Sequence, residues 1–220
     1  MLRATSTLAI MGAIAMAGTS VAEAQTRRAG STPSTSPMAM DVAGVRLGMP
    51  FEQVRAALAG TYRCDVSRNA LTFADLVQDE VTKRRGAIPA WREGTGVYGA
   101  LCKGPNGEDL KVFFAQAESG SVVRRFTLLI PTTGVDRADL LRQLAAKYGK
   151  PNRGEMNNGC WIEAGEFCGI LTKGPMFTIQ DLSTAVSIVG ERGKAAENAD
   201  EAAIAAAADR IAPKKSKAAF

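Results

Sequence analysis

The chain has 220 residues, of which 46% are hydrophobic and 6% aromatic, with four Cys, no His and a formal net charge of +5. This length and apolar content predict one compact domain, or two small ones. The absence of His excludes Ser-His-Asp and Cys-His catalytic systems, His-ligated zinc or haem, and imidazole acid–base chemistry at neutral pH.

The first 24 residues have the pattern of a cleavable signal peptide. Arg3 precedes an apolar run from Leu8 to Ala17, and Ala22-Glu23-Ala24 matches an A-x-A cleavage site. The run is shorter than the roughly 20 apolar residues that a spanning helix needs. No Cys directly follows the cleavage site, so no lipid anchor is expected there. The sequence therefore predicts residues 1–24 as a signal peptide and a soluble mature protein in the periplasm.

Both ends of the mature chain differ in composition from its centre. Residues 25–40 form a Ser/Thr/Pro-rich stretch without apolar periodicity, which predicts a disordered linker. Residues 191–220 are rich in Ala and Lys and are expected to be disordered or loosely helical, with a weak peripheral membrane contact through Lys214, Lys215 and Lys217. The body between them, 41–190, carries 18 basic and 16 acidic residues, which argues against nucleic acid as a partner.

The body contains signals for three helices and seven short strands. Pro50 to Ala59, Thr72 to Arg85 and Asp136 to Tyr148 combine apolar faces with capping residues at one end and Gly at the other. Thr72 and Asp75 match a capping box. The strands are expected at 96–102, 109–115, 122–130, 160–162, 167–171, 176–179 and 185–189.

Alternation of apolar and polar residues in these strands is typical of an antiparallel sheet with one face on a core. The sequence therefore predicts an α+β domain over 41–190, with helices packed on one face of an antiparallel β-sheet meander. Alignment of Gly48 with Gly134 also brings Val54 onto Leu140, which suggests two helix-plus-sheet halves. Two amphipathic helices align this well by chance, so a single unit remains the alternative.

The four Cys predict two disulfide bonds, because an even number of Cys in an exported chain is typical of disulfides. Three pairings are possible. Cys160 and Cys168 flank a predicted hairpin in which Gly165 would occupy the left-handed loop position, and this favours their pairing. Cys64 then pairs with Cys102. No Cys-x-x-Cys occurs, which argues against redox catalysis and an all-Cys zinc site, and no metal or cofactor is expected.

Two short motifs resemble known exported proteins. Val45-Arg46-Leu47-Gly48-Met49-Pro50-Phe51-Glu52-Gln53-Val54 resembles the opening of the SmpA/OmlA outer-membrane assembly lipoproteins and of the β-lactamase-inhibitor-protein-like fold. Pro50 stands where those families commonly have a capping Ser or Thr. Lys147-Tyr148-Gly149-Lys150-Pro151 is similar to a helix exit found in uncharacterised exported bacterial proteins. The resemblance implies an α+β fold of two helices and an antiparallel sheet, but without a lipid-bearing Cys it does not imply a membrane-anchored role.

The leading hypothesis is a non-catalytic binding module for an envelope protein or a cell-wall polymer. Trp91, Arg124 and Arg125 are the candidate partner-binding residues, because aromatic residues and Arg dominate interface energetics. Trp161 is a further aromatic anchor or packs over the disulfide of Cys160.

The alternative hypothesis is a carboxylate-based hydrolase acting on cell-wall glycans. Four of the five candidate carboxylates lie at or beside turns, where acidic side chains are normally solvated, and this favours the binding module over an enzyme. They are Glu93, Glu108, Asp109, Glu163 and Glu166.

Overall fold

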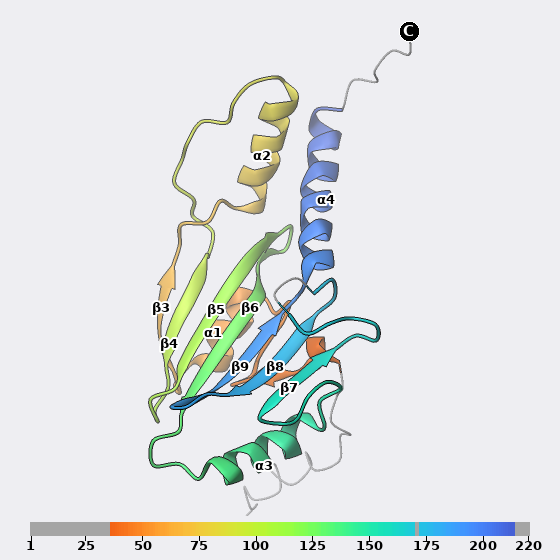
Figure 1. Ribbon diagram of the computed structural model, residues 1–220. Coiled ribbons are helices and arrows are strands. Elements are labelled where there is room, and N and C mark those ends of the chain that lie inside the picture. Colours follow the sequence, from red (N-terminus) through yellow and green to blue (C-terminus); the bar gives the residue numbers. More distant parts are fainter. Residues whose placement is uncertain (1–35, 170–171, 214–220) are drawn as a thin grey trace, which may run out of the picture. The chain divides into compact units, whose positions relative to one another are not determined.

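The computed structural model describes residues 36–169 and 172–213 (Figure 1). The predicted signal peptide, the linker up to residue 35 and the Lys cluster of the tail lie outside these residues. Within the expected linker, Pro37–Ala39 form one turn of 3-10 helix and Met40 is buried in the core. The chain thus joins the fold before residue 41.

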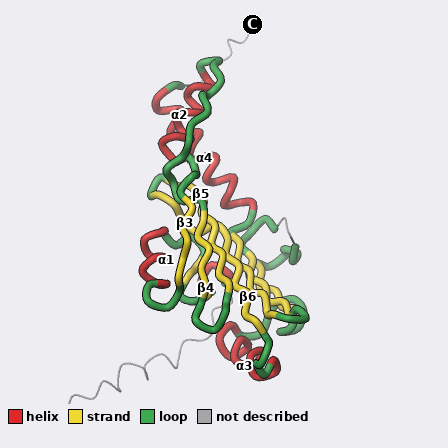
Figure 2. Tube along the Cα trace, turned by 90° about the vertical axis from the view of Figure 1, so that its left-hand side faces the viewer, coloured by secondary structure: helices red, strands yellow, loops and turns green. Residues whose placement is uncertain are grey.

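A seven-stranded antiparallel sheet forms the centre of the fold, and the predicted α+β class is confirmed. Its strand order is β3-β4-β5-β6-β9-β8-β7. Figure 2 shows the strands side by side. The strands are β3 (Arg63–Ser67), β4 (Gly99–Lys103), β5 (Asp109–Ala117), β6 (Gly120–Pro131), β7 (Asn158–Ile162), β8 (Met176–Asp181) and β9 (Ala185–Glu191). A separate two-stranded hairpin joins β1 (Asp41–Val42) to β2 (Val45–Arg46).

Two meanders meet in this sheet, and each follows a helix. Helix α1 (Phe51–Leu58) precedes β3 to β6, and α3 (Arg137–Tyr148) precedes β7 to β9. The two meanders join where β6 pairs with β9. Helix α3 begins as its sequence predicts, because the Asp136 carboxylate accepts hydrogen bonds from two backbone amides, and it ends at Gly149 with a φ of 72°.

The core lies on one face of the sheet, beneath α1 and α3, and alternation along the strands supplies it. In β5, Leu110 and Val112 are fully buried, while Lys111 between them is exposed. The Tyr148 hydroxyl donates a 2.7 Å hydrogen bond to the Asp41 carbonyl oxygen, which fastens α3 to β1. Burial raises the pKa of Tyr148 above its ordinary value. Within the described residues, neither of these two helices lies on the opposite face of the sheet, called here the open face.

Helix α2 (Phe73–Arg84) pairs with α4 (Lys194–Ile211) and not with the core. Val77 and Val81 pack against Ala207 and Ala208, and the Arg84 guanidinium binds the Asp209 carboxylate at 2.5 Å. The sequence did not predict firm burial of this tail, because the tail helix carries only two large apolar side chains, Ile204 and Ile211. The small Ala side chains explain the packing, because they allow two helices to approach closely. None of the described helices is long and apolar enough to cross a bilayer.

The predicted set of strands needs two corrections. Residues 167–169 form no strand, and β7 pairs with β8 in place of the expected hairpin partner, so that Cys160 lies opposite Thr178. β3 was not predicted, because its sequence, Arg-Cys-Asp-Val-Ser, has little apolar alternation. It forms because it pairs with β4 over all five residues.

Candidate functional site

Both predicted disulfide bonds are confirmed. Cys64 pairs with Cys102 across β3 and β4, and Cys160 pairs with Cys168, which lies in the loop after β7. The second bond forms although the hairpin expected to align it is absent. Within the described residues there is no free Cys, and no group of three His, Cys, Asp or Glu side chains is placed to hold a metal ion.

Trp91 lies in the loop between α2 and β4, residues 85–98, called here the Trp91 loop. Its side chain is 91% exposed, and that of Ile88 in the same loop is 93% exposed. Large apolar side chains are normally buried, so two of them projecting from one short segment form an unusual surface. The sequence identified Trp91 but not Ile88, although Ile88 stands between turn-forming Gly86 and Pro89.

The part of the Trp91 loop that follows Trp91 is fixed to the rest of the fold at Arg92 and Gly96. Arg92 binds Asp79 of α2 at 2.7 Å and Asp75 at 3.2 Å. Hydrogen bonds from Thr72, with a smaller contribution from Arg92, hold the pKa of the Asp75 carboxyl below its usual range. Ala70 and Gly96 exchange two backbone hydrogen bonds of 3.1 and 2.8 Å. Trp91 is therefore exposed although the residues that follow it are held in place.

Arg124 and Arg125 are neighbours on β6 but have different surroundings. The register of β5 and β6 shifts so that Arg124 is the extra residue of a bulge. Arg124 pairs with Glu197 of α4 at 3.6 Å, which gives it a role in fastening that helix. Arg125 lies on the open face, 3.9 Å from Glu191 of β9. Neither has a described contact with the Trp91 loop, so the three predicted residues do not form one site.

Arg125 lines a groove of about 540 Å³ on the open face, over β8 and β9. Thr178 and Gln180 lie along it, and Arg153 belongs to its far end. Arg153 and Cys160 form a bridge beyond β7, which places the backbones of the two Arg four strand spacings apart, or about 19 Å. Guanidinium, amide and hydroxyl groups and the Glu191 carboxylate thus line this groove, called here the polar groove, which the sequence did not reveal.

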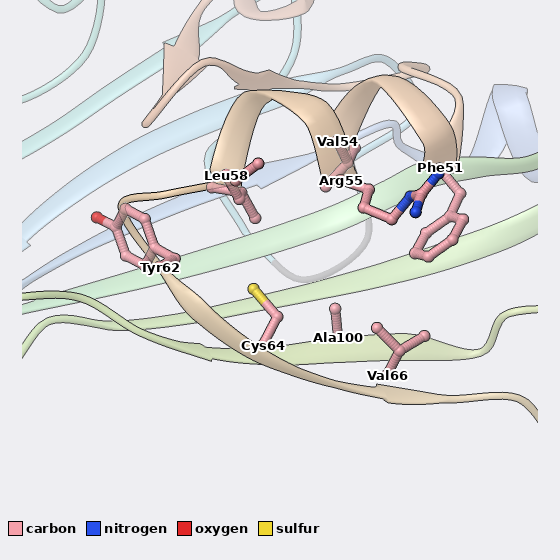
Figure 3. A pocket seen from close by; sticks show the side chains of 9 residues that line it. Phe51, Val54, Arg55, Leu58, Tyr62, Cys64, Val66 and Ala100 are labelled. Atoms are coloured by element: carbon pink, nitrogen blue, oxygen red, sulfur yellow. The ribbon is translucent and has the colours of Figure 1, made fainter.

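A second, apolar pocket of about 160 Å³ lies between α1 and the outer strands β3 and β4 (Figure 3). Phe51, Val54 and Leu58 line it from α1, and Cys64 and Val66 line it from β3. The sequence predicted the apolar face of the helix. The pocket itself depends on β3, which was not predicted.

The candidate carboxylates lie in three separate parts of the fold: before and at the start of β5, in the loop after β7, and in the Trp91 loop. Burial alone would raise the pKa of the Glu108 carboxyl. Hydrogen bonds from Asn106 and from the backbone outweigh this effect, so the pKa lies below its ordinary value. Glu108 precedes β5 and Glu163 follows β7, four strands apart, which corresponds to about 19 Å. Glycoside hydrolysis needs two carboxyls within about 9.5 Å and one raised pKa. Asp109 forms an ion pair with Lys103, and Glu166 accepts a hydrogen bond from the Lys173 amide. Glu93 is exposed in the Trp91 loop.

No protein-family model, curated protein or solved structure matches this chain.

Proposed function

We propose that this chain is a non-catalytic binding module of the periplasm that holds another envelope protein through the Trp91 loop. Two disulfide bonds support an oxidising compartment, and the signal-peptide pattern of residues 1–24 supports export. The separation of Glu108 from Glu163 favours binding over hydrolysis.

The exposure of Trp91 and Ile88 carries this proposal. Trp is enriched among the residues that contribute most to binding, since its large ring buries much apolar surface when a partner covers it. The anchoring of the loop by Arg92 reduces the conformational freedom that binding would otherwise remove. A protein partner with an apolar pocket therefore matches this loop.

Trp91→Ala is expected to weaken partner binding by about 30-fold or more, the effect of losing a residue that dominates an interface. Envelope extract would be passed over the immobilised protein, the retained partner identified, and its affinity measured with purified components. Ile88→Ala is expected to weaken binding by a smaller factor.

Phe167→Ala is the matched control, because Phe167 is also aromatic and 84% exposed but lies in the loop after β7. Its affinity is expected to stay within about threefold of the wild type, since peripheral contacts contribute little. Equal loss of binding in both variants, or loss only with Phe167→Ala, would show that the Trp91 loop is not the binding surface.

A second candidate function, binding of a cell-wall polymer, rests on the polar groove. Its length and its two Arg suit an extended chain that carries anionic groups, since guanidinium forks bind carboxylate and phosphate oxygens. Combined replacement of Arg125 and Arg153 by Ala is expected to reduce sedimentation with isolated peptidoglycan by about tenfold or more if each Arg contributes one charge-assisted contact. Arg142→Ala on α3 is the control, and equal sedimentation of all three proteins would exclude the groove.

A further inference from the structure

β3 is an edge strand with an open outer side. Among the described strands it pairs only with β4, and all five of its residues are exposed. No other described segment covers it. The unpaired backbone groups of an edge strand are a template for pairing with another chain, and proteins commonly block them with Pro or a bulge. β3 has no Pro, its pairing with β4 has no register shift, and the disulfide of Cys64 fastens it to β4.

Cys64 and Val66 direct their backbone groups outward from this edge. The Ser67 carbonyl oxygen accepts a 2.9 Å hydrogen bond from the Tyr98 amide, which lies on the β4 side. Alternate residues of an antiparallel strand direct their N–H and C=O groups to the same side. The groups of Asp65 and Arg63 therefore also face β4, and those of Cys64 and Val66 face solvent.

The side chains of residues 62–66 are complementary to their own sequence in reverse. When β3 pairs antiparallel with β3 of a second copy about a two-fold axis at Cys64, Arg63 lies opposite Asp65 of that copy, and Asp65 lies opposite its Arg63. On the other face, Val66 lies opposite Tyr62. Opposite charges and aromatic pairs with β-branched residues are favourable directly across two strands. The two Cys64 residues then exchange their outward backbone hydrogen bonds.

Neighbouring registers lack this match. An axis at Arg63 places two guanidinium groups opposite one another, and an axis at Asp65 does the same with two carboxylates, which is unfavourable. An axis at Val66 places Arg63 opposite Asn69, so no ion pair forms. The charge pattern of β3 therefore selects the register centred on Cys64.

The apolar pocket of Figure 3 opens beside the same edge. Tyr62, Cys64 and Val66 are among its lining residues, and Val66 is 39% exposed. A two-fold axis perpendicular to the sheet keeps both core faces on one side, so the pockets of the two copies become neighbours and Tyr62 of one copy meets Val66 of the other. Pairing thus removes apolar surface from water at both pockets.

From these observations we propose that β3 is a homodimer interface, with a second copy of this chain as its occupant and the two sheets continuous across Cys64. This interface is symmetric, as a two-fold dimer requires. It uses neither the Trp91 loop nor the polar groove, so it stands independently of the proposed function.

Charge reversal tests this interface. Sedimentation equilibrium of the oxidised mature chain, from micromolar to submillimolar concentration, is expected to show a monomer–dimer equilibrium for the wild type. Asp65→Arg and Arg63→Asp each place like charges at both paired positions and are expected to weaken the dimer by about tenfold or more. The double variant Arg63→Asp/Asp65→Arg restores opposite charges and is expected to restore the dimer.

Arg142→Asp on α3 is the control and is expected to dimerise like the wild type. Circular dichroism and a count of free thiols establish that each variant is folded and oxidised. A monomeric wild type over this range would overturn the proposal. Single variants that dimerise normally, or a double variant that stays monomeric, would overturn it equally.

Discussion

Replacing Cys64 and Cys102 together by Ser is expected to lower the free energy of unfolding by about 4 kcal/mol. The bond joins residues 38 positions apart, and a cross-link that closes a long loop removes much conformational freedom from the unfolded chain. The Cys160–Cys168 bond closes only 8 positions, so the corresponding double Ser variant is expected to lose about 2.5 kcal/mol. Urea unfolding of the three oxidised proteins measures these differences.

The order of the two losses is the informative result, since the loop length alone predicts it. β3 is an edge strand, so without its disulfide only its backbone pairing with β4 joins it to the sheet. A larger loss from the Cys160–Cys168 variant would contradict this explanation. It would show that the loop after β7 contributes to stability through contacts beyond the length of chain that the bond closes.

Trp161→Ala is expected to lower the free energy of unfolding by about 3–5 kcal/mol, the usual cost of removing a buried aromatic ring. Trp161 is 1% exposed and packs on the core face against two aromatic rings. Its ring centroid lies 5.5 Å from that of Phe177 and 6.3 Å from that of Tyr148. Its removal leaves a cavity where β7 and β8 meet α3.

Trp161→Phe is the matched variant. It keeps an aromatic ring and removes an indole N–H that has no hydrogen-bond partner among the described residues. Its loss in urea unfolding is therefore expected to be clearly smaller than that of Trp161→Ala. Equal losses from both variants would indicate that the ring contacts contribute little and that the fit of the indole itself is decisive.

Local signals predicted the helices and one disulfide pairing. Thr72 and Asp75 form the predicted capping box, and Asp136 caps α3 as its position before an apolar face indicates. These devices act within a few residues, so they can be recognised without knowledge of the fold. The pairing of Cys160 with Cys168 was correct although the predicted hairpin is wrong, because a short separation along the chain already favours it.

The features that depend on distant parts of the chain were not predicted. β3 becomes a strand only because β4 lies beside it, and its own residues carry little apolar pattern. Trp161 was expected either on the surface or over the disulfide of Cys160. It is buried on the other face of the sheet from Cys160, because consecutive residues of a strand point to opposite faces.

The candidate site was predictable only as separate residues. Trp91 and Arg125 were chosen for their side-chain chemistry, and the structure places them on unconnected surfaces, the Trp91 loop and the polar groove. Arg153 joins that groove through its bridge with Cys160, a contact that no local pattern indicates. Ile88 becomes a candidate only through its exposure in the folded chain, which the sequence did not indicate.

Photo-crosslinking in intact cells tests the proposed binding module most directly. A photoreactive amino acid would replace Ile88 or Trp91 in turn, with replacement of the exposed Arg142 on α3 as the control. Both loop positions are expected to give an adduct with the same envelope protein, and position 142 is expected to give none. Absence of an adduct from the loop, or the same adduct from position 142, would contradict the assignment of this loop as the binding surface.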